Sequence, residues 1–393
     1  MGLGIKTAIR RRIGGPYVNG DYHEAATLAR LALLPDGPLK PAPSDDAPLD
    51  IAFVVPFFQP GSGGHMTIAN LIRGLEAAGH RCSLWIDDPG RRCAKGAAAN
   101  LRSWFGPFSA PVACGTDGLA AAAPDVLVAT GWQTAQTVRT LPAAGRAYLV
   151  QDHEPEFFGT SSQRAGAEAS YGLGLYPVTA GSWLAELMDA RYGLPASSFE
   201  LGIDSRYGPE PNIARAEDTV LTYARWSTPR RAVPIALAAL GELHRRRPGT
   251  QIWTYGQSGD LGLDFPHVNK GVLRDQQLPG LYAQATVGLV LSMTNYSLVA
   301  QEMLACGLPC VELDSPSVVA AFGRDGAVDL APLEPGAIAA ALIRLLDDPQ
   351  LRRRRAEAGA LLRTERTWAH AAEAVAAGLR AAIDHTQQAP SAR

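Results

Sequence analysis

This chain of 393 residues has few cysteines, no long apolar run and little net charge, and each of these features excludes a class of protein. Its cysteines form no C-x-x-C pair and leave one over, which argues against a disulfide framework or a zinc site and predicts reduced, mostly buried thiols. No apolar run approaches the roughly 18 residues that span a membrane, and the apolar start of the chain is too short for a secretory signal. The formal net charge of -2 gives no global field that would attract nucleic acid. The cysteines are Cys82, Cys93, Cys114, Cys306 and Cys310.

What is present is the composition of a soluble globular protein, with 47% hydrophobic and 19% charged residues. A chain of this length usually divides into two domains. Together with the reduced cysteines, this predicts a cytoplasmic protein. The basic run Arg10–Arg12 allows a weak peripheral contact with the anionic inner face of a membrane. A solvated basic helix end is the alternative interpretation.

Changes in composition along the chain predict four segments. Residues 36–49 are rich in Pro and Asp, so residues 1–49 are interpreted as an N-terminal extension and linker. Residues 50–200 and residues 201–365 are expected to form one domain each, connected through residues 195–217. Residues 366–393 carry apolar side chains at helical spacing, and this helix is expected to pack back toward the N-terminal domain.

Both halves alternate apolar strands with helices. Ile51–Val55 is a continuous apolar run, as a strand covered on both faces requires. A glycine turn, a helix and a second strand at Cys82–Ile86 complete a βαβ unit. The second half begins again with strands at Thr219–Tyr223 and Gln251–Tyr255. We therefore predict an α/β fold of two Rossmann-like, doubly wound parallel-sheet domains with a cleft between them.

The glycine turn is the first candidate binding element. Gly61, Gly63 and Gly64 lie between a strand and a helix, where the backbone can approach a ligand and the helix N-terminus offers N–H groups. A tight turn that binds nothing is an equal alternative.

The second element follows the first strand of the second half. Arg225 comes directly after that strand, and Arg230 and Arg231 follow five and six positions later. Ligands bind at the carboxyl ends of strands in doubly wound sheets, and guanidinium groups bind phosphates bidentately. The arrangement predicts a clamp for the two phosphates of a sugar nucleotide, with a solvated surface loop as the alternative.

The third element, residues 292–307, again runs from strand through a polar loop into a helix. The N–H groups of Ser297, Leu298 and Val299 would face phosphate at the helix N-terminus. Glu302, one turn into the helix, lies among apolar neighbours and needs partners, which a pair of ribose hydroxyls would supply. A locally bonded Glu302 on an exposed helix face is the alternative.

The fourth element is the loop Gln151–Phe158 at the end of a first-domain strand. Asp152, His153 and Glu154 combine carboxylates with an imidazole, which suits sugar binding and proton transfer. An ordinary polar loop at a strand end is the equal alternative. We expect this loop to face the donor sugar across the cleft and to hold the acceptor hydroxyl.

Together these motifs resemble those of GT-B glycosyltransferases, specifically the large retaining group called family four. Its pattern comprises a glycine-rich first turn, an Arg…Lys phosphate clamp, and a helix with two glutamates eight positions apart before Ala-Cys-Gly-x-Pro. Three of the segments look like those of the WsaF-type rhamnosyltransferases of polysaccharide assembly: Gln151–Phe158, the turn Thr228–Arg230, and Glu302–Ala305. The matching residues, between about Ile51 and Trp368, are Gly61–Gly64, Gln151–Phe158, Arg225 with Arg230, and Glu302 before Ala305–Pro309.

The resemblance implies a nucleotide-sugar donor, which is a substrate and not a cofactor, and a glycan or lipid-linked acceptor. No metal ion is expected. Two departures concern the clamp lysine, which is Arg230 or Arg231 here, and the first glutamate, which falls on Thr294. A neutral threonine suits a 6-deoxy sugar, so L-rhamnose from dTDP-β-L-rhamnose is the predicted donor sugar. The full predicted donor set is Gly61, Gly63, Gly64, Arg225, Arg230, Arg231, Gly271, Thr294, Ser297, Leu298, Val299 and Glu302.

Two other functions stay open at this point. An NAD(P)-dependent oxidoreductase would use Asp87 or Asp88, which end the second strand, on the adenosine ribose. Against it, the G-x-G-x-x-G pattern would need a glycine at Met66. A non-catalytic sugar-nucleotide-binding protein with a GT-B fold is the second alternative, because Thr294 replaces a family glutamate.

Overall fold

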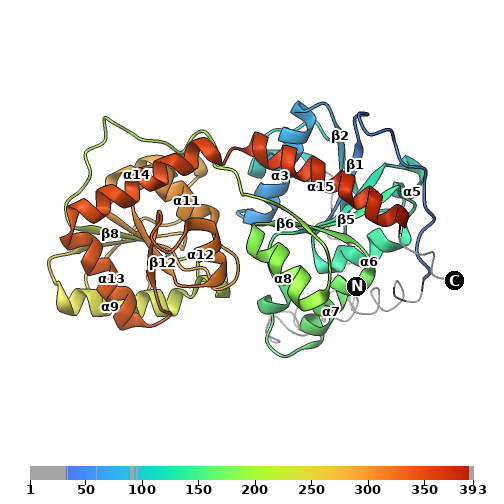
Figure 1. The fold of residues 1–393 in the computed structure, drawn as a ribbon. Coiled ribbons are helices and arrows are strands. Elements are labelled where there is room, and N and C mark those ends of the chain that lie inside the picture. Colours follow the sequence, from blue (N-terminus) through green and yellow to red (C-terminus); the bar gives the residue numbers. More distant parts are fainter. Residues whose placement is uncertain (1–31, 33, 59, 89–92, 94–95, 389–393) are drawn as a thin grey trace, which may run out of the picture. The chain divides into compact units, whose positions relative to one another are not determined.

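The computed structural model describes residues 32, 34–58, 60–88, 93 and 96–388, which form two compact units (Figure 1). The first unit comprises the described residues up to Thr179, Leu187–Ser198 and those from Ala372 onward. The second comprises Ala180–Glu186 and Phe199–Ala371. The basic run Arg10–Arg12, on which the predicted membrane contact depends, lies outside the described residues.

A seven-stranded sheet with the order β3-β2-β1-β4-β5-β6-β7 forms the centre of the first unit, and β1 pairs in parallel with both β2 and β4. Residues Ile51 to Val55 of β1 are fully buried, because helices cover both faces of the sheet (Figure 1). The elements are β1 (Asp50–Pro56), α3 (Gly63–Ala77), β2 (Arg81–Asp87), α4 (Ala97–Phe105), β3 (Val112–Cys114), α5 (Leu119–Ala122), β4 (Val126–Ala129), α6 (Trp132–Thr140), β5 (Gly145–Val150), η1 (Glu154–Phe157), α7 (Ser162–Ser170), η2 (Tyr171–Leu173), β6 (Tyr176–Ala180), α8 (Ser182–Tyr192) and β7 (Ser197–Phe199).

The second unit repeats this architecture with a six-stranded sheet in the order β10-β9-β8-β11-β12-β13. Its neighbouring strands are parallel, and β8 lies between β9 and β11. The elements are β8 (Thr219–Tyr223), η3 (Pro229–Arg231), α9 (Val233–Arg246), β9 (Gln251–Tyr255), β10 (Val268–Asn269), η4 (Asp275–Gln277), α10 (Leu278–Gln284), β11 (Val287–Leu289), α11 (Leu298–Ala305), β12 (Cys310–Leu313), α12 (Pro316–Phe322), β13 (Asp329–Ala331), α13 (Pro335–Asp347) and α14 (Pro349–Glu365). The last helix, α15 (Trp368–Gln388), begins in this unit and belongs to the first unit from Ala372 onward.

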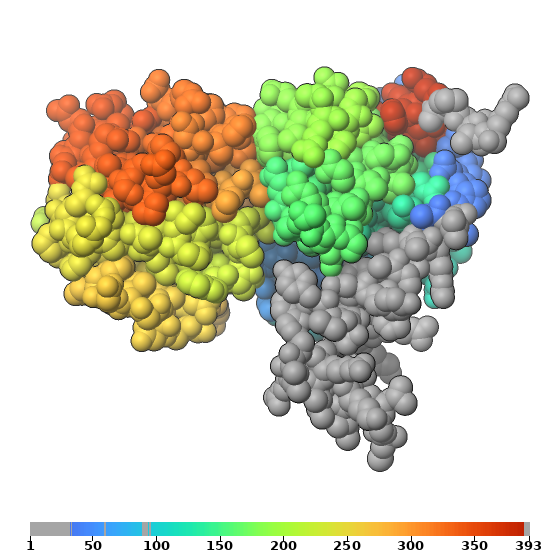
Figure 2. All heavy atoms as spheres, turned by 90° about the horizontal axis from the view of Figure 1, so that it is seen from below, coloured from blue at the N-terminus to red at the C-terminus, as the bar shows by residue number. Residues whose placement is uncertain are grey.

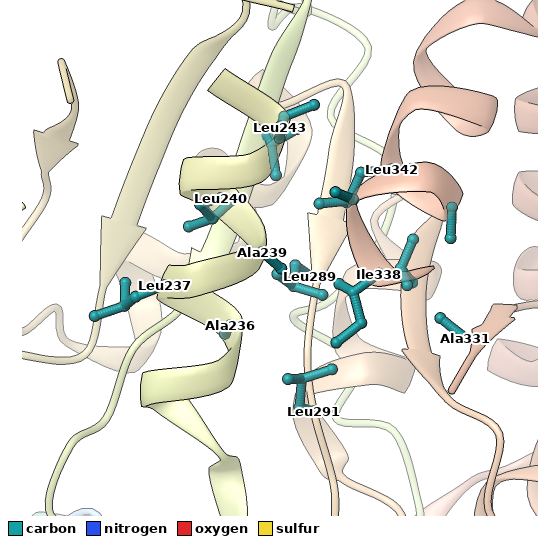
Figure 3. Packing of buried hydrophobic residues seen from close by; sticks show 14 of the residues in the cluster. Ala236, Leu237, Ala239, Leu240, Leu243, Leu289, Leu291, Ala331, Ile338 and Leu342 are labelled. Carbon is teal, nitrogen blue, oxygen red and sulfur yellow. The ribbon is translucent and has the colours of Figure 1, made fainter. Parts of the chain in front are cut away.

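One buried cluster of the second unit packs α9 and α13 against this sheet (Figure 3). Leu240 and Leu243 of α9 join Leu289 of β11 and Ile338 and Leu342 of α13 in one buried cluster. Each fully buried side chain of this size stabilises the fold by about 1.5–3 kcal/mol relative to an exposed one. This packing holds β8 and β11 rigidly, and the loops that carry the candidate site follow those two strands.

The last helix, α15, packs its C-terminal part on the first unit. The backbone N–H of Arg146 donates to Thr386 Oγ1 at 3.0 Å, and Gln387 Nε2 donates to the Ala144 carbonyl at 2.9 Å. Gly145 allows the close approach, because a Cβ there would lie 2.7 Å from Ile383 Cγ1. In Figure 2 the red atoms at the end of this helix accordingly lie beside blue and green atoms of the first unit.

The segment predicted as a linker is more structured than its composition indicated. The Gly37 N–H donates to the Arg139 carbonyl at 2.9 Å, and Leu39 forms an isolated bridge with Ala143. Leu49 is fully buried. The carbonyls of this Pro-rich stretch are satisfied by side chains of the first unit, as where the Arg146 guanidinium donates to the Gly37 carbonyl at 2.5 Å. The predicted connection at residues 195–217 likewise contains a strand, β7.

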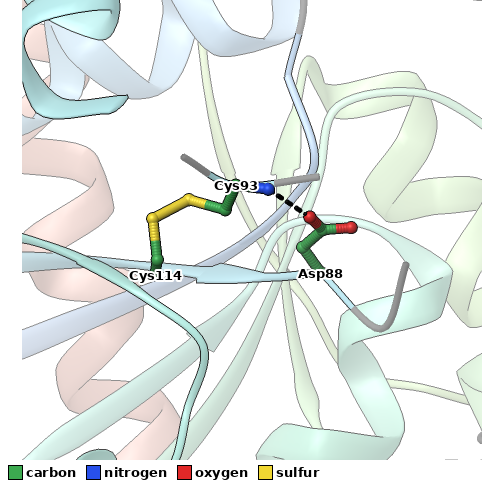
Figure 4. The surroundings of a disulfide bond; sticks show 3 residues. All are labelled: Asp88, Cys93 and Cys114. Carbon is green, nitrogen blue, oxygen red and sulfur yellow. Dashed lines mark hydrogen bonds between the residues drawn. A yellow bond between two sulfur atoms is a disulfide. The ribbon is translucent and has the colours of Figure 1, made fainter. Parts of the chain in front are cut away.

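The prediction of five reduced cysteines is wrong for one pair. Cys93 and Cys114 form a disulfide with their Cα atoms 5.8 Å apart (Figure 4). Cys93 follows β2 and Cys114 ends β3, and these strands are neighbours in the sheet, which the spacing of 21 residues along the sequence does not reveal. The Cys93 N–H donates to Asp88 Oδ2 at 2.6 Å. Cys82, Cys306 and Cys310 are buried free thiols, as predicted.

Candidate functional site

The candidate donor residues gather at the carboxyl edge of the second sheet. The chain leaves β8 toward β9 on one side and returns to β11 on the other, so β8 and β11 flank the topological switch point, where doubly wound sheets bind ligands. Arg225 follows β8, and the loop 290–297 follows β11. The sequence-predicted residues of these two segments are therefore brought together by the topology.

The arginine turn is fixed to the loop after β11 by two hydrogen bonds. Arg231 Nη1 donates to Ser292 Oγ at 2.9 Å, and the Met293 N–H donates to the Arg230 carbonyl at 3.1 Å. The turn is the short helix η3, and it ends at Ala232, whose φ of 45° begins α9. Arg225, Arg230 and Arg231 are all half-buried. The guanidinium groups of η3, together with that of Arg225 just before it, can neutralise a diphosphate.

Gly271 lies at the same edge. Its φ of 72° is in the left-handed region, and its carbonyl accepts the Gly256 N–H at 2.8 Å. The adjacent Tyr255 carbonyl accepts the Ala224 N–H at 2.8 Å. Two backbone hydrogen bonds, through Gly256 and Tyr255, therefore connect Gly271 with Ala224, the residue before Arg225.

The N-terminus of α11 differs in one respect from the prediction. Ser297 is the N-cap, and its Oγ accepts the Val299 N–H at 3.1 Å, so that N–H is already paired in this structure. Leu298 is the first helical residue. Thr294 is 7% exposed, and its carbonyl accepts a hydrogen bond from Ser317 Oγ at 2.8 Å.

Glu302 is half-buried and surrounded by charged groups that the sequence reasoning did not identify. Burial, followed by the negative charges of Asp275 and Asp204, raises its pKa to about 8, while Arg206 and a hydrogen bond with Tyr207 oppose the rise. A pKa raised in this direction favours the protonated carboxyl group, which can both donate to and accept from a pair of hydroxyls. No local sequence signal linked residues 204–207 with Glu302, because they are brought together only by the fold.

In the first unit, the glycine turn and the polar loop lie together at the carboxyl edge of the sheet. Gln151 Nε2 donates to the Gly64 carbonyl at 3.2 Å. Gly61 has a φ of 71°, and a Cβ on Gly63 would meet nothing within 4 Å. Ser62 caps α3, and its Oγ lies 2.8 Å from His65 Nδ1.

The loop Asp152–Glu154 is held by an aromatic cluster. The His153 side chain is completely buried, stacks on Tyr171, and places Nε2 2.7 Å from the Tyr192 hydroxyl and Nδ1 3.2 Å from Glu156 Oε1. Both carboxylate oxygens of Glu154 accept hydrogen bonds, from the Tyr148 hydroxyl at 2.6 Å and from the Trp132 N–H at 3.1 Å. Asp152 Oδ1 accepts the His153 N–H at 3.0 Å. The catalytic role of these three residues stays a prediction.

Within residues 32–388, apart from 33, 59, 89–92 and 94–95, no group of three or more His, Cys, Asp or Glu side chains could hold a metal ion. In that same part of the chain, no helix has the length and apolar content needed to cross a bilayer.

Residues 217–348, which lie in the second unit, match the family model described as Glycosyl transferases group 1. Over 200 residues the chain is 32% identical to the O-antigen biosynthesis protein RfbC of Myxococcus xanthus. That match covers 49% of this chain and 16% of RfbC, so the chain spans a small part of that relative's length.

Solved structures share the fold across both units. HepE of Anabaena in complex with UDP superposes with a TM-score of 0.67 at 16% identity and covers 85% of this chain and 100% of its own. WaaG, a glycosyltransferase involved in lipopolysaccharide biosynthesis, gives a TM-score of 0.61 at 17% identity and covers 84% and 99%. The predicted fold class is therefore confirmed: the chain has two Rossmann-like parallel-sheet units of the GT-B type, and its second unit carries the pattern of the group 1 glycosyl transferases.

Proposed function

We propose that the protein is a glycosyltransferase that moves a sugar from a nucleoside diphosphate donor to a hydroxyl acceptor during polysaccharide assembly. One observation carries the proposal: two hydrogen bonds connect the arginine turn with the loop after β11, at the switch point of the second sheet. Arginine side chains and a polar loop that follow two strands of the sheet meet there, and the match to the group 1 model covers these same strands. The O-antigen role named for RfbC supports the choice of a glycan or lipid-linked acceptor.

A direct experiment tests this proposal. The purified protein is incubated with UDP- and dTDP-sugars and a glycan acceptor, and release of nucleoside diphosphate and transfer of the sugar are both measured. We expect transfer by the native protein and its loss in Glu302→Ala. Binding of the donor without hydrolysis or transfer would instead support the non-catalytic alternative. The match of residues 217–348 to the group 1 glycosyl transferase model supports a glycosyltransferase over the oxidoreductase alternative.

The proposed sugar is L-rhamnose, carried by dTDP. Thr294 occupies the position of a family glutamate that lies near the donor sugar, and a threonine there suits a sugar with fewer hydroxyl groups. Sites that hydrogen-bond a hydroxyl reject analogues that lack it, so Thr294→Glu is expected to shift preference toward a hexose with the additional hydroxyl. The ratio of kcat/KM for dTDP-rhamnose and UDP-glucose measures the shift. Equal turnover of both donors by the native protein would contradict the assignment of the sugar.

We further propose that transfer needs no metal ion. Positive charge for the leaving diphosphate comes from Arg225, Arg230 and Arg231 and from the N-terminus of α11. Dialysis against EDTA is expected to leave the transfer rate unchanged. Activity that disappears with EDTA and returns with Mg²⁺ or Mn²⁺ would show that this proposal is wrong.

A further inference from the structure

Glu312 is a completely buried carboxyl group that has no place in the predicted donor set. It lies in β12, the neighbour of β11, among the buried residues Cys310, Val311 and Leu313. A carboxylate in such a strand is costly unless its oxygens are hydrogen-bonded. A hydrophobic residue of the same size would fill the space without that cost.

The carboxyl group of Glu312 instead organises the loop after β11. Its Oε1 accepts the Ser292 N–H at 2.8 Å and the Leu313 N–H at 2.9 Å, and its Oε2 accepts the Ser292 hydroxyl at 2.9 Å. Both oxygens are thus occupied by fixed donors. The only proton of the Ser292 hydroxyl is directed at Glu312, so the lone pairs of Oγ face the opposite way.

Those lone pairs accept the hydrogen bond from Arg231 Nη1 at 2.9 Å. The donors therefore point in one direction, from the guanidinium through the hydroxyl to the carboxylate, and each hydrogen bond strengthens the next. The charge of Arg231 also acts on Glu312 itself. Burial raises the pKa of Glu312 to about 7, and the positive charge of Arg231 is among the effects that oppose this rise.

We infer that Glu312 is a positioning residue that acts through Ser292 to hold the Arg231 guanidinium in place for the donor diphosphate. The inference rests on the proposed function. A long arginine side chain loses rotamer freedom when a ligand fixes it, and the hydrogen bond to Ser292 restricts Arg231 before the donor binds. Arg231 thereby becomes a preorganised member of the phosphate clamp.

Calorimetric titration with UDP and dTDP, and NMR titration with uridine and thymidine, test the inference. Glu312→Gln and Ser292→Ala are each expected to weaken diphosphate binding about tenfold and to leave nucleoside binding unchanged. In an Arg231→Ala background, adding Glu312→Gln is expected to weaken binding no further, because the group that it positions is gone. Ser292→Ala keeps the buried carboxyl group, so it tests the same link where Glu312→Gln folds poorly.

Asp329→Asn is the matched control. Asp329 is a buried carboxylate on the adjacent strand β13, and its Oδ2 accepts from Arg344 at 2.6 Å without contacting Ser292. It is expected to leave both affinities unchanged. Equal weakening of nucleoside and diphosphate binding by Glu312→Gln, or the same tenfold loss with and without Arg231, would overturn the inference. Failure of the native protein to bind either diphosphate would overturn the proposed function itself, and the inference with it.

Discussion

Replacing Arg225 by alanine is expected to weaken binding of the donor nucleotide by more than about tenfold without unfolding the protein. Arg225 directly follows Ala224, whose backbone N–H donates to the Tyr255 carbonyl at 2.8 Å. This hydrogen bond holds the backbone of Arg225 at the edge of the sheet. Removing one charged partner of a desolvated phosphate typically costs about 2–5 kcal/mol. The half-buried environment of Arg225 favours the lower part of that range.

Isothermal titration calorimetry with UDP and dTDP measures the effect. Arg245→Ala is a suitable control, because Arg245 belongs to the same unit, is 73% exposed and pairs with Glu242 at the far end of α9. The control should bind the nucleotide like the native protein, and both variants should keep its thermal stability. Unchanged nucleotide affinity in Arg225→Ala would remove this residue from the clamp.

The second sheet could be predicted closely from the sequence. The predicted strands Thr219–Tyr223 and Gln251–Tyr255 have the bounds observed for β8 and β9. Both are apolar runs that end in a polar loop, and in a parallel sheet covered by helices a run of this kind has no other stable position. Since the carboxyl ends of such strands share one edge, the placement of the arginine turn beside the loop after β11 also followed from the sequence.

Features that depend on neighbouring strands could not be predicted in this way. Cys93 and Cys114 meet because β2 and β3 are adjacent, and Tyr207 meets Glu302 across a loop that has no periodic pattern. Glu312 did leave a signal, since a charged residue interrupts an otherwise apolar strand. That signal indicates a buried partner, but only the structure identifies the partner as Ser292.

The burial of His153 is the structural feature with the largest consequence for catalysis. The sequence made it a candidate general base, because an imidazole titrates near neutrality. In the structure its ring is fully buried, and its nitrogens face Tyr192 and Glu156 at 2.7 and 3.2 Å. The hydrogen bond from His153 also lowers the pKa of Glu156. This environment favours a role for His153 in orienting the loop. It does not favour proton exchange between the imidazole and the hydroxyl of the sugar acceptor.

We therefore expect His153→Ala to lower kcat/KM for the acceptor about 100-fold, mostly through the acceptor KM, by displacing the neighbouring Asp152 and Glu154, since a shift of roughly 1 Å in a positioning group costs about that much. The shape of the pH–rate profile should stay that of the native enzyme. Tyr192→Phe removes only the hydrogen bond to Nε2 and should lose less. His80→Ala serves as a control, because His80 lies beside the amino end of β2, where its Nδ1 accepts the Leu49 N–H at 3.0 Å, and it should leave the kinetics native.

Kinetics over pH, with the product anomer assigned by NMR, distinguish the two roles of the loop. If the donor phosphate takes the acceptor proton, as retention of configuration implies, Asp152→Asn and Glu154→Gln should act mostly on the acceptor KM. General acid–base catalysis is worth about 10²–10⁴-fold, so a protein base would show as a loss of that size in kcat together with loss of the acidic limb of the profile. If His153→Ala removes that limb and the product is inverted, the imidazole carries the proton, and the buried ring must leave its tyrosine cluster during the reaction.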